Sequence, residues 1–470
     1  MLQKEPFCGR KRKRYQKLSS EKILAFLFVI AIISFEIKIN SFPFSEDDGI
    51  LVIQRKKNNN QREIFKDSES FTNNYGNNGP KYHLIFSTGC SPFQDWQSYV
   101  FFYHVLKSGQ LGNVTRVASC GNSHDAITVK QLHEEQISIM SDRFSLHITP
   151  EYSKSVTPGK TFKYYNKPFG ALDFLQNVMK FPTPESEKHE NTIVMLLDPD
   201  QMIIRPFTND FSTSTEVWKP YNTKVPKRIK VEHGSPFAQQ YGFGIQWKTK
   251  VNVTYVANGP SRVENITFDE ARGHYVIGPP YIATAKDMYK ITQKWTEFVP
   301  RVHDEYPHLL AEMFAYCFAA AHLNLPHRVA QSFMVSDPGA GGEGWRLIHE
   351  MKDKVCTPPQ NLNPHILHYC QRYMLGKWFI NKYRLRKDFM SCDAPLLREP
   401  PPDIAKQYNY QITPDGERRE FKMKTGPSRH AYMICALIPR LNQAARYYKE
   451  HHCKGKANYD ETYIFHSEMS

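Results

Sequence analysis

Two kinds of hydrophobic pattern alternate along residues 82–322 of the 470-residue chain. Short runs with alternating or β-branched side chains predict strands, and longer apolar stripes at helical spacing predict helices. The predicted strands cover residues 82–88, 115–120 and 193–197, and the predicted helices cover residues 96–106, 169–179 and 308–322. This succession predicts an α/β fold with a Rossmann-like mixed sheet flanked by helices, whose strand ends contribute loops to one face.

The second half of the chain carries fewer strand signals. Residues 338–344 form a glycine-rich stretch whose spacing matches neither a phosphate-binding loop nor a dinucleotide fingerprint. Three consecutive prolines at 400–402 mark a boundary, and an amphipathic helix is predicted over residues 432–452. We therefore expect a main domain over residues 81–400 and a C-terminal extension over residues 401–470 that packs on it.

The N-terminus combines a basic tail with an apolar run. Residues 1–22 hold eight Lys/Arg and two Glu, so this tail carries +6 of the formal charge of +14 and the rest of the chain carries +8. The next segment, residues 23–40, is near the lower limit of the roughly 17–25 residues that span a bilayer. Because the basic residues precede it, a type II signal anchor with a luminal body is predicted. A cleaved signal peptide is the alternative.

Features beyond the predicted anchor agree with a luminal body. Polar residues 41–80 predict a flexible stem. Asn-x-Ser/Thr acceptors for glycosylation occur at Asn113, Asn252 and Asn265. If Cys8 is cytosolic, eight cysteines remain, and an even number suits disulfides in an oxidising compartment while leaving their pairing open.

The most informative motif is the pair Asp198 and Asp200, which follows the predicted buried strand 193–197 directly. Ligands of open α/β sheets bind outside the carboxyl ends of the strands. Two carboxylates at i and i+2 suit a hard divalent ion such as Mn²⁺ or Mg²⁺ that also holds a diphosphate. Asp-Pro-Asp is also common turn chemistry, so the motif alone does not decide between the two interpretations.

Four further side chains are candidates for the same site. His368 could supply an imidazole ligand, which would favour Mn²⁺ over Mg²⁺, or be an ordinary buried histidine. Glu312 lies in an apolar helix, where it either contacts a sugar hydroxyl or acceptor or is paired for structural reasons. Lys167 opens a helix, as a diphosphate clamp or a solvated lysine. Gln97 follows the first strand, beside a loop where a uracil ring could sit.

Short motifs in one consistent order resemble a known family, the peptidyl serine α-galactosyltransferases and hydroxyproline O-arabinosyltransferases. The resembling blocks are His83–Thr88 with Asp95-Trp96-Gln97, Asn113–Cys120, Asn166-Lys167-Pro168, Leu197–Pro206, Glu312–Tyr316, His368-Tyr369 and Gly376-Lys377-Trp378. They span about residues 81–400. Lys377 departs from the asparagine that is usual in the last block, and residues 205–275 and 340–365 align poorly.

The resemblance implies a GT-A type fold, with residues 81–400 as the catalytic domain of a retaining glycosyltransferase. It implies a UDP-sugar donor and dependence on Mn²⁺ or Mg²⁺, with Asp198, Asp200 and His368 as metal ligands. We expect Lys167 to be a second diphosphate clamp, Gln97 a donor contact, and Glu312 a catalytic residue. The acceptor would be a serine or hydroxyproline hydroxyl of a secretory-pathway protein, and the location would be the Golgi or ER membrane.

Three other functions are compatible with parts of the sequence. A non-catalytic protein of the same fold could bind glycoproteins or scaffold other transferases. A metal-dependent phosphoesterase could use the two aspartates, although such enzymes usually need more carboxylates and a second metal. Nucleic-acid binding is disfavoured, because the basic cluster lies in the predicted cytosolic tail. The donor sugar, the acceptor and the oligomeric state do not follow from the sequence.

Overall fold

The computed structural model describes residues 79–156, 159–214, 216–219, 229–359, 362–386, 388–413 and 416–463. The predicted basic tail and anchor, and all but the end of the predicted stem, lie outside these residues. No helix in the described part of the chain is both long and apolar enough to cross a bilayer.

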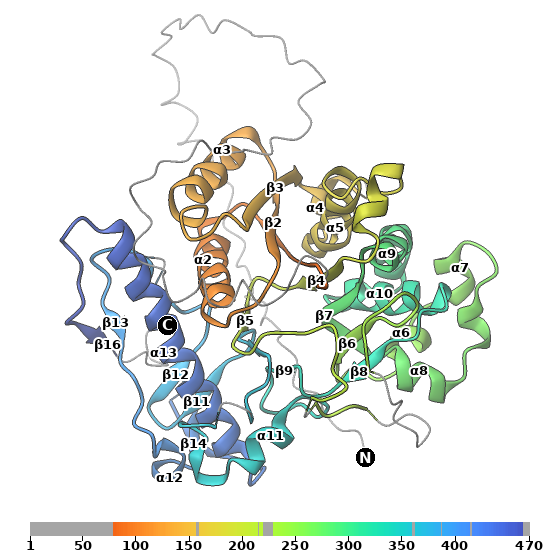
Figure 1. The fold of residues 1–470 in the computed structure, drawn as a ribbon. Coiled ribbons are helices and arrows are strands. Elements are labelled where there is room, and N and C mark those ends of the chain that lie inside the picture. Colours follow the sequence, from red (N-terminus) through yellow and green to blue (C-terminus); the bar gives the residue numbers. More distant parts are fainter. Residues whose placement is uncertain are drawn as a thin grey trace, which may run out of the picture. The chain divides into compact units, whose positions relative to one another are not determined.

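A seven-stranded mixed sheet forms the centre of the described structure, in the order β3-β2-β1-β4-β7-β6-β8 (Figure 1). Its strands are β1 (Tyr82–Gly89), β2 (Asn113–Cys120), β3 (Phe144–Pro150), β4 (Ile193–Leu197), β6 (Phe237–Gln240), β7 (Ile277–Thr284) and β8 (Arg328–Ala330). Strand β7 alone runs antiparallel to its neighbours β4 and β6, while the other strand pairs are parallel. The predicted mixed α/β sheet is thus confirmed.

The orientation of β7 follows from its connection to β6. Gln240, the last residue of β6, pairs with Ile277, the first residue of β7, so segment 241–276 returns to the edge of the sheet that it left. No crossover is made, and an antiparallel pair results. Pro279 and Pro280 hide this strand from sequence patterns, because proline is confined to strand edges and irregularities. The register of the pair indeed shifts between Ala238 and Gln239, opposite these prolines.

Alternating side chains of β4 face two separate cores. Val194 and Leu196 pack in the core that contains helices α5 (Asn166–Asn177), α9 (Ala285–Glu305) and α10 (Ala311–His322). Ile193, Met195 and Leu197 pack in the core that contains side chains of α2 (Pro92–Lys107). Strand β4 is therefore buried on both faces, as a continuous apolar run predicts.

A second, three-stranded sheet joins distant parts of the chain. Its strands lie in the order β5 (Gln201–Ile203), β10 (Ile366–His368) and β9 (Met334–Val335). Strand β5 starts directly after the turn that ends β4. The segment around residue 368 is thereby hydrogen-bonded beside the end of the central strand.

The C-terminal region forms a third core around the long helix α13 (Gly426–His452). The hairpin β11 (Tyr373–Leu375) and β12 (Trp378–Ile380) packs in this core and turns at Gly376, whose φ of +55° favours glycine. Disulfides Cys356–Cys435 and Cys392–Cys453 each tie α13 or its end to earlier segments. Helix α13 starts six residues before the predicted 432–452 helix, with Pro427 in its first turn.

The remaining elements are shorter and lie around these cores. They are α3 (Ser123–Leu132), α4 (Tyr152–Ser155), α6 (Gln246–Thr249), α7 (Val253–Ala257), α8 (Phe268–His274), α11 (Trp345–Glu350), α12 (Ile404–Gln407), β13 (Leu396–Leu397), β14 (Tyr410–Ile412), β15 (Arg418–Glu420) and β16 (Thr462–Tyr463), with a π-helix at His133–Ile137 and 3₁₀ turns at Lys163–Tyr165, Pro184–His189, Arg262–Asn265 and Lys352–Lys354.

Candidate functional site

Asp198 and Asp200 lie in the tight turn that follows β4. The N–H of Gln201 donates to the carbonyl of Asp198 (3.0 Å), and the side-chain oxygen of Gln201 accepts from the N–H of Asp198 (3.0 Å). The Gln201 amide nitrogen donates to the carbonyl of Pro279 (3.0 Å) in β7. The Asp-Pro-Asp motif is therefore a turn and also a pair of carboxylates at a strand end.

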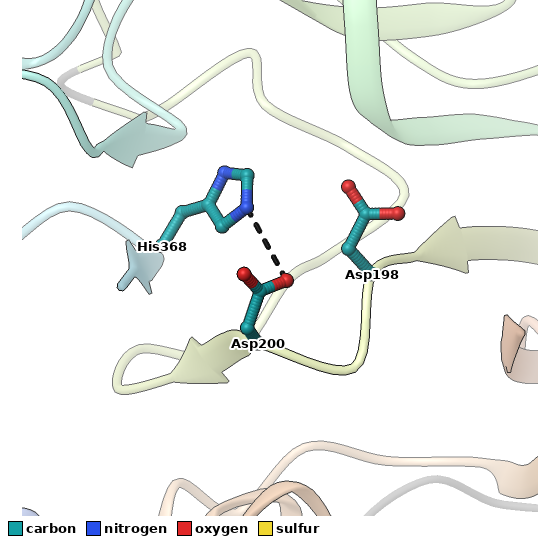
Figure 2. A group of neighbouring side chains, drawn as sticks. All are labelled: Asp198, Asp200 and His368. Carbon is teal, nitrogen blue, oxygen red and sulfur yellow. Dashed lines mark ion pairs between the residues drawn. The ribbon is translucent and has the colours of Figure 1, made fainter. Parts of the chain in front are cut away.

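His368 reaches this turn from the second sheet. The antiparallel pairing of β10 with β5 sets His368 opposite Gln201, and its Nε2 lies 3.3 Å from Oδ1 of Asp200. Figure 2 shows the imidazole and the two carboxylates of Asp198 and Asp200 gathered around one space. One potential ligand atom from each of the three residues lies within 4.8 Å of the other two. The structure thus brings the predicted trio together, and its role as a metal site stays a prediction.

Asp200 is held as a carboxylate by its neighbours. Burial by itself would raise the pKa of Asp200, but the positive charges of Lys382 and His368 and their hydrogen bonds outweigh burial and lower it far below its ordinary value. Its side chain is 7% exposed. A buried anion of this kind is stable only while a cation contacts it.

Lys167 and Glu312, both predicted site residues, contact each other beside Asp198. Lys167, in the first turn of α5, places its Nζ 2.6 Å from Oδ1 of Asp198 and 3.4 Å from Oε2 of Glu312. Glu312 lies in the first turn of α10, and the indole N–H of Trp295 donates to its carbonyl (2.8 Å). The partner of the buried glutamate is thus a lysine, and the solvated-lysine interpretation of Lys167 is excluded by its 11% exposed side chain.

Glu312 has an unusual ionisation for a glutamate. Burial raises its pKa to about 7 and the carboxylate of Asp198 adds to this rise, while Lys167 opposes it. Its Oε1 atom is buried without a hydrogen-bond partner in the described structure. Near neutral pH this carboxyl can therefore accept or donate a hydrogen bond to a group placed beside it.

Lys382 is a site residue that no sequence pattern indicated. It follows β12 by two residues, and its ammonium group pairs with Oδ2 of Asp200. Its side chain is only 10% exposed. Each aspartate of the motif therefore has its own lysine, Lys167 for Asp198 and Lys382 for Asp200. Lys167 was predicted as a site residue, whereas Lys382 was not, because it lies far from the motif in the sequence and no local spacing points to it.

A buried ion pair holds the loop after β1, which is the loop predicted to lie beside a uracil ring. Arg116 pairs with Asp95 (2.7 Å), and it also donates to Oγ1 of Thr88 (2.9 Å) and to the carbonyl of Gly89 (3.3 Å). The disulfide Cys90–Cys120 joins the ends of β1 and β2 at the same place. Both sequence blocks that carry Asp95 and Arg116 thus build one rigid strand-end loop.

Gln97 is not brought into this cluster. Its side chain lies in α2, is 1% exposed, and donates to the carbonyl of Phe93 (2.7 Å) within the same helix. A donor contact through Gln97 stays a prediction. Its neighbour Trp96 is a core residue and is 7% exposed.

The three candidate ligands fit a divalent cation. Ligand oxygens bind Mg²⁺ at about 2.0–2.1 Å, so atoms on opposite sides of one ion lie about 4 Å apart, and the 4.8 Å limit requires only a small adjustment. Two carboxylates with one imidazole suit Mn²⁺ well. His368 Nδ1 is buried without a hydrogen-bond partner in the described structure.

Comparison with known proteins supports the family that the motifs resemble. Residues 82–264 match the hydroxyproline O-arabinosyltransferase family N-terminal domain. The peptidyl serine alpha-galactosyltransferase of Arabidopsis thaliana is 25% identical over 327 residues, which cover 68% of this chain and 34% of the relative. The protein of the same name from Chlamydomonas reinhardtii is 22% identical over 363 residues, which cover 73% and 41%. The chain thus matches less than half the length of either relative.

Solved structures show only distant similarity. Galactosyltransferase LgtC in complex with donor and acceptor sugar analogs overlaps with a TM-score of 0.35 at 10% identity, covering 62% of this chain and 87% of that one. The WbbM bifunctional glycosyltransferase overlaps with a TM-score of 0.33 at 9% identity, covering 63% and 47%. The assignment therefore rests on the sequence matches: residues 82–264 are similar to the N-terminal domain of the hydroxyproline O-arabinosyltransferase family, and the chain is similar to two peptidyl serine alpha-galactosyltransferases.

Proposed function

We propose that this protein is a metal-dependent glycosyltransferase of GT-A type that transfers galactose or arabinose from UDP to a serine or hydroxyproline hydroxyl. The observation that carries this proposal is the convergence of Asp198, Asp200 and His368 at the carboxyl end of β4. That edge of an α/β sheet is where nucleotide ligands bind. The match of residues 82–264 to the hydroxyproline O-arabinosyltransferase family N-terminal domain supports the same chemistry.

The cation site would act on the leaving diphosphate. Mn²⁺ or Mg²⁺ bound there would neutralise the charge that develops on the diphosphate as the sugar departs. Asp198 and Asp200 would hold the ion with His368, and Lys167, which is buried against Asp198, would add a second positive charge on the same side. Retention of configuration, as the family resemblance implies, belongs to this proposal as well.

Glu312 would orient the sugar or the acceptor hydroxyl. Its free Oε1 is buried, and its Oε2 is shared with Lys167, so only one oxygen is available to a substrate. A carboxyl with a pKa of about 7 can change between accepting and donating a hydrogen bond at neutral pH. Glu312 would therefore bind a hydroxyl group in either state.

We also propose that the protein acts in the lumen of the secretory pathway, in the Golgi or ER, as a type II membrane protein. Three disulfides in the described residues support an oxidising compartment. The predicted acceptors Asn113, Asn252 and Asn265 are exposed, as glycosylation requires. The predicted anchor over residues 23–40 supplies the membrane attachment in this proposal.

The test is release of UDP from UDP-galactose, UDP-arabinose and UDP-glucose, with and without Mn²⁺, using serine and hydroxyproline peptides. We expect release with one donor that requires both peptide and metal. Asp200→Asn should abolish it, while Asp388→Asn, in an exposed ion pair with Arg386, should not. Binding of UDP without turnover for every donor would favour the non-catalytic alternative, and metal-dependent release of phosphate would favour a phosphoesterase.

A further inference from the structure

We propose that Lys382 is an internal counter-ion of Asp200, which a divalent cation displaces and which then binds the diphosphate of the incoming nucleotide sugar. This inference rests on the proposed function and names a step within the same site. It gives Lys382 two successive anionic partners.

Lys382 contacts the carboxylate of Asp200, to which a metal ion would have to bind. Asp200 offers two oxygens, of which Oδ1 faces His368 at 3.3 Å and Oδ2 is taken by the ammonium group of Lys382. Both side chains are at most 10% exposed, so water does not screen this pair strongly. A metal ion bound to Asp200 would bring its positive charge close to that ammonium group, and the repulsion between like charges would drive Lys382 away.

The formal charges show where Lys382 would go. Counted for the two aspartates and their two lysine partners alone, Lys167 and Lys382, the charges balance in the absence of metal. A divalent cation leaves an excess of two positive charges, which the dianionic diphosphate of a nucleotide sugar matches. Metal and diphosphate are therefore expected to bind cooperatively, because each compensates the charge that the other introduces.

The segment that carries Lys382 is held at the surface by an aromatic contact. Tyr383 stacks on Phe93 of α2 with ring centroids 5.4 Å apart and an interplanar angle of 12°. Tyr383 is 59% exposed and Phe93 is 37% exposed, so this contact can open without disturbing a core. Phe93 itself lies in the first turn of α2, which follows β1 and the loop predicted to lie beside the uracil ring. A short displacement of residues 382–383 would thus carry the ammonium group from Asp200 toward a bound diphosphate.

The experiment measures Mn²⁺ binding by electron paramagnetic resonance and UDP binding by calorimetry, with the full chain. The variants are Lys382→Met and Lys382→Gln, the second keeping a polar group in case the first fails to fold. Lys286→Met is the matched control, because Lys286 pairs with Glu190 (3.0 Å) at the opposite end of β4 and is 42% exposed. Relative to the unmodified chain, we expect Lys382 variants to bind Mn²⁺ alone about tenfold more tightly and UDP with Mn²⁺ about tenfold more weakly.

Three other results would contradict this inference, part of it, or the proposed metal site. Mn²⁺ affinity that is unchanged in the Lys382 variants, with normal binding of Mn²⁺ and UDP by the unmodified chain, would overturn this inference and leave the proposed function intact. Tighter Mn²⁺ binding with unchanged UDP affinity would overturn the transfer of Lys382 to the diphosphate. No Mn²⁺ binding by the unmodified chain, even with UDP, would overturn the proposed metal site and this inference together.

Discussion

The Nζ atom of Lys167 lies 2.6 Å from Oδ1 of Asp198, and the side chains of both residues are mostly buried. This pair joins the first turn of α5 to the turn after β4. It therefore links two of the sequence blocks that carry the family resemblance. Its removal should affect stability and substrate binding together.

Lys167→Met is expected to destabilise the fold by about 3 kcal/mol, because it leaves a partly buried carboxylate without its cation. Affinity for UDP in the presence of Mn²⁺ should fall as well. Urea unfolding and calorimetry measure the two effects. The control Lys286→Met removes a partly exposed pair and should cost about 0–1 kcal/mol. A loss of equal size in both variants would contradict the importance assigned to the Lys167 pair.

Glu312→Gln should change the pH dependence of stability. The pKa of Glu312 is raised from 4.5 to about 7 in the folded state, where burial favours the protonated form. The unmodified chain therefore loses stability as pH rises from 4.5 to 7, by about 3 kcal/mol from this group. The glutamine variant lacks this loss, so it should gain relative stability between pH 5 and pH 8 in urea unfolding. A constant difference between the two proteins over this range would contradict the raised pKa. Transferase activity of the variant should be strongly reduced.

Glu216→Gln should have the opposite pH dependence. Burial would raise the pKa of Glu216, but hydrogen bonding and charge from His365 (3.0 Å), with Arg205 and Ser332, outweigh burial and lower it from 4.5 to about 2. The lowered pKa stabilises the fold above pH 4.5, and this contribution is lost as pH falls toward 2. The variant should thus be about 3 kcal/mol less stable at pH 7, and the difference should shrink toward pH 3. Glu297→Gln, at an exposed pair, is the control and should show little pH dependence.

Two disulfides should differ in their effect on UDP binding. Loss of Cys90–Cys120 opens a loop of 30 residues and loss of Cys356–Cys435 opens one of 79 residues, which predicts about 3.5 and about 4.5 kcal/mol. Replacing either pair with serines should therefore lower the melting temperature. Only the first pair fixes the loop after β1, so only its loss should also weaken UDP binding markedly. Equal UDP affinity of the two variants would contradict a role of that loop in nucleotide binding.

Local hydrophobic patterns predicted the strands and helices whose own apolar residues lead to their burial. The strand at 193–197 and the apolar helix that became α10 are of this kind, although α10 starts at Ala311 and not at 308. Strand β7 was not predicted, because two prolines interrupt its pattern and its place depends on pairing with β4 and β6. The helix in residues 92–107 was predicted to begin later, although Pro92 is a regular first-turn residue.

The sequence predicted those site residues whose type and position relative to a strand or helix are enough to suggest a role. Asp198 and Asp200 follow a strand end, and residue type and position also singled out Glu312, Lys167 and His368. The family resemblance then implied that His368 is a metal ligand. Lys382 and the Arg116–Asp95 pair could not be found in this way, because nothing local distinguishes a buried lysine from a solvated one. Only the folded chain shows that residue 382 lies against Asp200. Ion pairs between residues this far apart in the sequence follow no fixed sequence spacing.

The pairing of β10 with β5 has a consequence for shortened forms of the protein. Residues 82–264, the part that the family match covers, supply Lys167 and both aspartates, whereas Glu312, His368 and Lys382 all come from later in the chain. A product of alternative splicing or proteolysis that ends near residue 264 would keep two of the three predicted metal ligands, Asp198 and Asp200, and would lose the third, His368. Such a fragment is expected to neither capture Mn²⁺ nor turn over substrate, whatever its expression level.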